Sequence, residues 1–380
     1  MKTKNIFKLI ILSAIIVLSS CSSDKNTPEP IACVVDAPLT YSFEHEGENT
    51  VSYSGQANRL AVAKQVYDAL NGDVAMDRAT IDAIIDNDNS KLFTKTAENV
   101  ENSNSRGNAT FSRSNLIDDL NSIIDTWCAN SSTFADPNSI ASAGNAGYYG
   151  SYQLDARGWE SDQQYAKMLI GALCLEQVAW DYLTKMGDCS DGNTWCTDNE
   201  DRSSTYTQRE HYYDEAFGYV YGLDDNDLDA DINNGLLLGK YLNKHYTGNN
   251  YSGVDYRQRV YDAFKMGRQA VVDNCNEELE RQIEIINSSL SKVVAWHAQD
   301  YLTSAASAIG TADFHHDVSE AWGFVYSLQF MKVNSMTVFS HSQVMGMLNT
   351  LDAGANGAWD LDAATLNSMA SDINNMVTFD

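Results

Sequence analysis

Residues 211–223 read His211-Tyr-Tyr-Asp-Glu215-Ala-Phe-Gly218-Tyr-Val220-Tyr-Gly-Leu223, and residues 316–328 read His316-Asp-Val-Ser-Glu320-Ala-Trp-Gly323-Phe-Val325-Tyr-Ser-Leu328. Both follow one pattern, His-x-x-x-Glu-Ala-aromatic-Gly-aromatic-Val-Tyr-x-Leu. At about 100° per residue, the His, the Glu and two small residues of each copy fall on one stripe of a helix. Small residues let a neighbouring backbone come close, so we expect each stripe to pack against another helix.

A second repeated segment precedes each copy. Val178-Ala179-Trp180 with Asp181–Thr184 reappears as Val294-Ala295-Trp296 with Asp300–Thr303. Two helix pairs therefore read as copies of one unit, and two copies are too few for a solenoid. The sequence predicts a helical domain over 39–380 with two pseudo-symmetric halves, the first to about residue 250 and the second over 251–380.

Hydrophobic periodicity predicts the fold class, which is all-α. No proline occurs between Asn138 and Asp380, which permits long helices because proline breaks a helix interior. Short extended pieces are expected at Tyr41–Phe43 and Val51–Tyr53, and an irregular segment is expected at Ser139–Ser151. Helical periodicity occurs in 57–70, 115–128, 160–185, 209–223, 232–245, 256–272, 276–305, 315–332, 341–351 and 363–376.

The first 38 residues have the features of a lipoprotein export signal followed by a linker. Lys2, Lys4 and Lys8 form a basic beginning to the chain, and the apolar stretch over 6–18 is too short to span a membrane. Together these features are typical of a cleaved signal peptide over 1–20. Leu18-Ser-Ser-Cys21 resembles the lipobox of bacterial lipoproteins, which implies lipidation of Cys21. Ser22 in the next position, rather than Asp, resembles the pattern sent to the outer membrane of Gram-negative cells. Either face of that membrane is compatible with the sequence. Residues 21–38 read as a flexible polar tether.

Composition argues against one class of partner, and the cysteines predict one disulfide. The net charge of −27 argues against nucleic acid, which is bound through Lys and Arg. The predicted compartment permits disulfides, and Cys189 and Cys196 flank a polar loop and are the expected pair. Cys174 lies beside an apolar run and is expected to be a buried free thiol. No Cys spacing typical of zinc occurs.

Three interpretations of the repeated His and Glu residues stay open. Each pair could be a partly buried hydrogen-bonded pair that fixes helix register. The pairs could bind a divalent metal ion, iron or zinc, through His211, Glu215, His316 and Glu320. They could also act as acid and base groups of an enzyme.

Lys167 and Glu176, on the predicted helix 160–185, could form a buried ion pair. No zinc-peptidase, nucleophile-elbow, Walker, dinucleotide or haem-attachment motif is present.

The double His-x-x-x-Glu-Ala-aromatic-Gly helix, with Lys167-x-x-x-Gly171-Ala172-Leu173 before it, resembles the imelysin superfamily. More closely it resembles a group of imelysin-related lipoproteins that carry a domain-of-unknown-function label. Their openings are similar to Tyr41-Ser-Phe43 and Val51-Ser-Tyr-Ser54-Gly55-Gln56-x-x-Arg59-Leu60. The likeness covers about residues 41–347. It implies two related helical bundles outside the inner membrane and a link to iron or haem acquisition. The chain departs from the imelysin signature Gly-x-His-x-x-Glu, because its acid lies four residues after His.

These observations predict a non-enzymatic lipoprotein of the cell envelope that captures a metal ion or a metal-bearing ligand of the haem type. The alternative is a structural or interaction lipoprotein whose His/Glu pairs only pack helices and which binds envelope protein partners. A metallopeptidase of the imelysin type ranks third. Changing both histidines to Ala separates the first two hypotheses, because only the first requires that metal affinity be lost.

Overall fold

A computed structural model describes residues 33–100, 111–186, 202, 204–223, 237–248 and 254–379. The chain divides into two units, Met1–Val34 and Val35–Asp380, and the second unit contains all of the helices and strands described. The predicted signal peptide, the lipidated Cys21 and most of the tether lie outside the described residues. So do Cys189 and Cys196. Cys174 is a buried free thiol, as predicted, and Cys275 and Cys33 are each disulfide-bonded.

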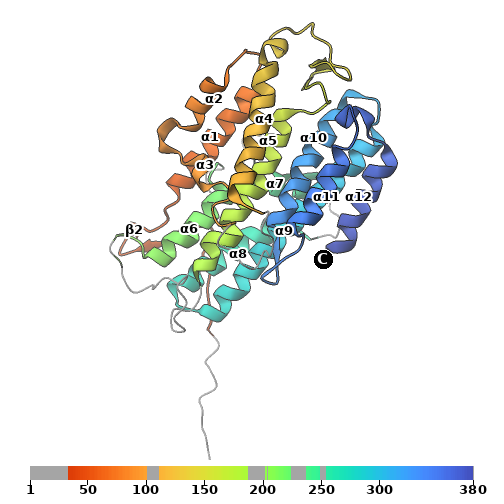
Figure 1. The fold of residues 1–380 in the computed structure, drawn as a ribbon. Helices are drawn as coiled ribbons and strands as arrows, with labels where there is room; N and C mark the ends of the chain where they lie inside the picture. Colours follow the sequence, from red (N-terminus) through yellow and green to blue (C-terminus); the bar gives the residue numbers. More distant parts are fainter. Residues whose placement is uncertain are drawn as a thin grey trace, which may run out of the picture. The chain divides into compact units, whose positions relative to one another are not determined.

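Helices make up most of the described residues, which confirms the predicted all-α class (Figure 1). Predicted helices 256–272, 341–351 and 363–376 match α8, α11 and α12 residue for residue, and the short helices α2 and α3 were not predicted. The α-helices are α1 Ser54–Leu70, α2 Arg78–Ile85, α3 Leu92–Lys95, α4 Arg113–Phe134, α5 Ser161–Leu169, α6 Gln208–Tyr221, α7 Leu238–Gly248, α8 Tyr256–Val272, α9 Asn276–Ser307, α10 Ala312–Ser327, α11 His341–Leu351 and α12 Ala363–Met376.

The strands of the described chain form short antiparallel hairpins. β1 Glu44–His45 pairs with β2 Glu48–Asn49, β3 Gly147–Tyr149 with β4 Tyr152–Leu154, and β5 Lys332–Val333 with β6 Met336–Thr337. The first hairpin lies between the two pieces expected to be extended. Its turn has Glu46 at φ 53 and Gly47 at φ 84, the left-handed geometry of two-residue hairpin turns.

The predicted helix 160–185 is continuous, but only its beginning is α-helical. After α5 it widens into the π-helical segments η3 Ile170–Leu175 and η4 Gln177–Asp181, then tightens into the 3₁₀ segment η5 Tyr182–Met186. Side chains in this segment are buried on all sides through Ala179. Groups from elsewhere bond its carbonyl oxygens: the Ala97 N–H donates to Ala172 O at 2.7 Å and Lys332 Nζ donates to Ala179 O at 2.8 Å.

Two buried helices organise the packing. α9 lies against α8, α10 and α12, while α5 lies against α10, α4 and α1 (Figure 1). The motif helix α6 packs on α1, η5 and α8. Since α5 precedes residue 250 and yet packs on the second motif helix, the two motif halves are interleaved. In the described part of the chain, no helix is both long enough and apolar enough to span a bilayer.

Candidate functional site

Both motif helices begin at a threonine cap. The Thr207 side chain accepts the Glu210 N–H and Glu210 bonds back to the Thr207 N–H, a capping box that starts α6. The Thr311 side chain likewise accepts the Phe314 N–H at the start of α10. Each His therefore lies near a helix start, and its Glu follows one turn later on the same face.

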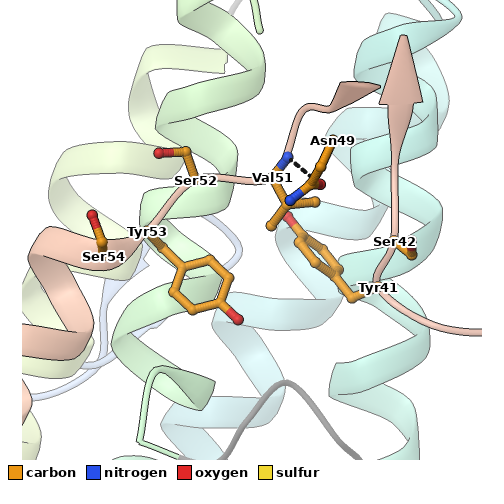
Figure 2. Close-up of a pocket in the computed structure, with 7 residues that line it drawn as sticks. All are labelled: Tyr41, Ser42, Asn49, Val51, Ser52, Tyr53 and Ser54. Atoms are coloured by element: carbon orange, nitrogen blue, oxygen red, sulfur yellow. Dashed lines mark hydrogen bonds between the residues drawn. The ribbon is translucent and has the colours of Figure 1, made fainter. Parts of the chain in front are cut away.

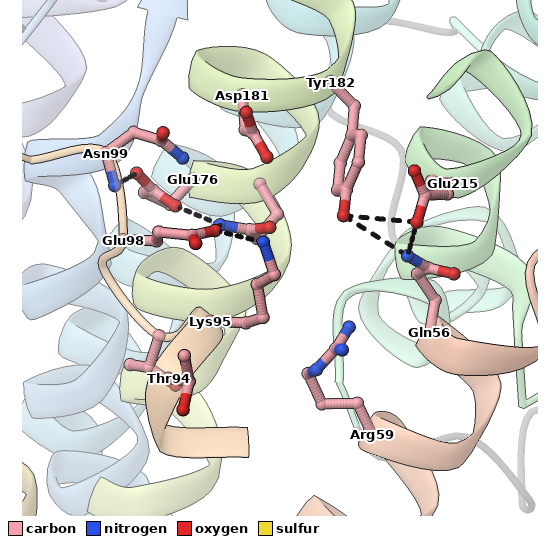
Figure 3. Close-up of polar contacts among 12 residues, drawn as sticks. Gln56, Arg59, Thr94, Lys95, Glu98, Asn99, Glu176, Asp181, Tyr182 and Glu215 are labelled. Atoms are coloured by element: carbon pink, nitrogen blue, oxygen red, sulfur yellow. Dashed lines mark hydrogen bonds and ion pairs between the residues drawn. The ribbon is translucent and has the colours of Figure 1, made fainter. Parts of the chain in front are cut away.

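The first pair, His211 and Glu215, contacts the chain opening and the end of the π-helical region. His211 Nδ1 lies 3.1 Å from Ser52 O, and its Nε2 lies 3.8 Å from Glu215 Oε1. The same carboxylate oxygen accepts from Gln56 Nε2 at 2.8 Å and from Tyr182 OH at 3.4 Å, as Figure 3 shows. Glu215 is therefore already bonded by donors from α1 and η5.

The second pair, His316 and Glu320, has the more deeply buried glutamate and more charged neighbours. His316 Nδ1 lies 2.7 Å from Glu160 Oε2, and its Nε2 lies 4.0 Å from Glu320 Oε2. Glu320 Oε1 accepts from Lys167 Nζ at 2.7 Å and from Tyr241 OH at 2.8 Å. The side chains of Lys167 and Glu320 are only 2% and 6% exposed. This is an interior ion pair, made between α5 and α10.

The two sites repeat one another beyond the His and Glu residues. The tyrosine of each Asp-Tyr-Leu-Thr segment lies by the motif glutamate. Tyr182 OH donates to Glu215 Oε1 at 3.4 Å in the first copy, and in the second copy burial and the nearby charge of Glu320 raise the pKa of Tyr301. Each histidine is also stacked on a tyrosine: His211 on Tyr206 with ring centroids 4.5 Å apart, and His316 on Tyr152 at 4.6 Å. The internal repeat thus preserves a contact pattern, with Gln56 in the place that Lys167 takes in the second copy.

The small residues of each stripe allow close helix packing, as predicted. A Cβ added to Gly218 would lie 2.5 Å from the Tyr53 Cβ at the start of α1, and one added to Gly323 would lie 2.5 Å from the Lys167 Cβ on α5. Ser327, the small residue that follows in the second copy, accepts the Gly171 N–H and donates to Lys167 O. The stripes therefore hold α1 against α6 and α5 against α10.

Burial and neighbouring charges set the ionisation of the second site. Burial alone would raise the pKa of Glu320, but Lys167 and His316 lower it well below its ordinary value. Burial and Asp162 raise the pKa of Glu160 to about 7. Burial alone would lower the pKa of His316, but its hydrogen bond to Glu160 raises it above its ordinary value. Glu160 and His316 are hydrogen-bonded to one another, so the protonation of one affects that of the other.

The residues present do not fit a resident metal ion. Among the described residues no group of three His, Cys, Asp or Glu side chains could hold a metal, so the four predicted ligands do not form one site. His316 directs its two nitrogens at two different carboxylates, and one ion cannot reach both. Lys167 already compensates Glu320, and a second cation there would be repelled. Metal binding by His211, Glu215, His316 and Glu320 stays a prediction.

Sequence reasoning missed several partners. Lys167 pairs with Glu320 and not with Glu176, so the predicted buried pair within helix 160–185 is wrong. Glu176 instead accepts the Asn99 N–H at 2.9 Å (Figure 3). It also accepts from Gln177 Nε2 at 2.9 Å. The tyrosines of the Asp-Tyr-Leu-Thr segment could have been predicted as part of the site, because this segment occurs once before each motif helix. The sequence around Tyr241 and Glu160 carries no such signal.

A shallow hollow of about 420 Å³ lies beside the first pair (Figure 2). The side chains at its wall are neutral, and the charges behind it are paired: buried Asp214 accepts from Tyr41 OH and from Arg268 Nε, each at 2.8 Å. The Ser52 N–H donates to the same carboxylate at 3.1 Å, which fixes the opening segment on α6. The hollow is lined by Tyr41, Ser42, Asn49, Val51, Ser52, Tyr53 and Ser54.

Comparison with known proteins identifies a family without an assigned function. A family model described as a domain of unknown function, DUF4856, matches residues 38–380. No match to the chain was found among curated proteins or among solved structures. The match begins at the end of the predicted tether and covers the whole helical domain. The likeness to the imelysin superfamily stays a prediction.

Proposed function

The chain belongs to the DUF4856 family, and we propose that it is a non-enzymatic binding protein of the cell envelope, anchored through a lipid on Cys21. In this proposal the two His/Glu pairs hold the helices in register. One observation carries it: at both copies the glutamate is already bonded by interior donors, Gln56 and Tyr182 at Glu215, and Lys167 and Tyr241 at Glu320. Bonded in this way, neither carboxylate is poised to take a proton from a substrate.

The Leu18-Ser-Ser-Cys21 sequence supports the anchor, and the polar residues over 21–38 would hold the domain away from the bilayer. The neutral hollow in Figure 2 is lined by side chains of the opening segment, and a ligand or an envelope partner would bind there. A lipid-anchored domain of this kind would act by presenting its surface near the membrane.

Capture of a metal ion, iron or zinc, is the second candidate, and one observation favours it. The gaps between His Nε2 and Glu Oε, 3.8 Å and 4.0 Å, exceed hydrogen-bonding distance, and the two imidazoles are 23% and 27% exposed. An exchangeable ion could enter the gap between His211 and Glu215, with the remaining ligands supplied by water or by a bound chelate. The gap at Glu320 is less favourable for a cation, because Lys167 already compensates that carboxylate.

One experiment compares the two candidates. Protein purified without chelator is analysed for metals by mass spectrometry before and after it is offered iron, zinc and manganese, together with the His211→Ala, His316→Ala double variant. We expect a metal-free protein whose variant loses melting temperature. Near-stoichiometric metal that the double variant loses would overturn the register role and establish capture.

A further inference from the structure

Three lysine ammonium groups surround a single aromatic ring in this acidic chain. Lys167 Nζ, Lys240 Nζ and Lys244 Nζ lie 5.4, 5.8 and 5.5 Å from the ring centroid of Tyr241. Two of these lysines come from α7 and one from α5. The chain has 52 acidic residues and 25 Lys and Arg residues, so a convergence of three cations stands out against the charge of the molecule.

The charges around this ring are unevenly compensated. Lys167 is paired with Glu320, and Lys244 Nζ donates to the neutral hydroxyl of Tyr301. Asp300 lies near enough to Lys244 for the lysine to lower its pKa against the rise that burial causes. Within the ranges that the structure describes, Lys240 has no carboxylate at ion-pair distance, and its ammonium group lies over the Tyr241 ring.

The surroundings of Lys240 are unfavourable for a cation on its own. Lys240 is half-buried, and burial, followed by the charges of Lys167, Lys244 and Lys64, lowers its pKa, while Glu320 acts in the opposite direction. A desolvated ammonium with cationic neighbours gains most from a negative partner. An anion beside Lys240 would supply this partner.

We propose that Lys240, with Lys244 beside it over the Tyr241 ring, binds a phosphoryl group. A phosphate dianion matches two ammonium groups, and lysine binds phosphate as a point charge that does not require bidentate geometry. Free phosphate and a phospholipid headgroup share this chemistry, and the proposed anchor would keep the site close to headgroups. The site is separate from the register role proposed for the His/Glu pairs and does not depend on it.

Titration calorimetry of the full chain in detergent with inorganic phosphate and pyrophosphate tests the site. Co-sedimentation with phosphatidylglycerol or phosphatidylcholine vesicles tests the lipid source. The variants are Lys240→Gln and Lys240→Arg, and the control is Lys265→Gln, which removes a lysine paired with Asp262 at 2.9 Å on α8. We expect saturable binding that weakens by about tenfold or more in Lys240→Gln and persists in the other two variants.

The readouts separate a binding role from a structural one. Because Lys240 lacks a carboxylate partner in the described chain, Lys240→Gln should keep or raise the melting temperature. Binding to inorganic phosphate identifies a soluble source, and binding only to phosphatidylglycerol vesicles identifies the headgroup. The proposal is overturned if neither probe binds, if Lys240→Gln binds like the unmodified chain, or if Lys265→Gln weakens binding equally.

Discussion

Replacing Lys167 by Met should leave a buried carboxylate without its cation. Lys167 and Glu320 lie 2.7 Å apart with 2% and 6% of their side chains exposed, and removing one partner of such a pair costs about 3–5 kcal/mol. Glu320 would keep its hydrogen bond from Tyr241, which places the expected loss near the lower end, about 3 kcal/mol. Urea unfolding at pH 7.5, followed by circular dichroism, measures the loss.

The double variant Lys167→Met, Glu320→Leu provides the control. Exchanging both partners for apolar groups of similar size should bring the free energy of unfolding back to within about 1 kcal/mol of the unmodified protein. Without Lys167 the pKa of Glu320 rises, so the single variant should recover stability at pH 5, where the carboxyl can take a proton. A single variant as stable as the unmodified protein at pH 7.5 would refute the buried-pair interpretation.

Three further outcomes follow from the same contacts. Folding raises the pKa of Glu160 to about 7 and also raises the pKa of His316, so protonation of either group favours the folded chain. The melting temperature should therefore fall as the pH rises from 5 to 8. In thermal scans at a series of pH values, Glu160→Gln should show a smaller fall. Gly323→Ala should lower the free energy of unfolding in urea by about 1–3 kcal/mol, because the added Cβ would meet Lys167. Gly346→Ala on α11, where the added Cβ meets open space, should raise it by about 0.5–1 kcal/mol. Lys332→Met should cost about 1–3 kcal/mol by leaving Ala179 O without that donor, while Lys64→Met, which removes an exposed pair with Asp68, should change stability by less than about 1 kcal/mol.

The helices that the sequence predicts best have both a clear apolar face and a polar cap. Asp255, Ser340 and Asp362 each accept a backbone N–H at the start of α8, α11 and α12, and these boundaries were predicted to the residue. The region 160–185 was predicted as a helix but not as π-helical. Its side chains are buried on nearly all sides, so hydrophobic periodicity carries no information about the number of residues per turn.

The site was predictable as far as spacing along a helix allows. A separation of four residues brings His211 to Glu215 and His316 to Glu320, and the small residues on the same stripes lie at the helix contacts. Lys167 lies 153 positions from Glu320 along the chain. Contacts at such separations depend on tertiary packing, which the pattern of one segment does not encode.

The widened turns of η3 and η4 alter the rotational phase of the helix that contains them. One residue inserted into an α-helix turns everything after it by about 100° around the axis. Lys167, before the π-helical turns, points at Glu320 on α10, and Tyr182, after them, points at Glu215 on α6. One continuous helix thereby directs side chains at two different neighbouring helices, at α10 before the π-helical turns and at α6 after them. Deleting one residue between 170 and 181 would preserve the apolar composition and still turn Tyr182 away from its glutamate, so the number of residues in this segment is constrained independently of their identity.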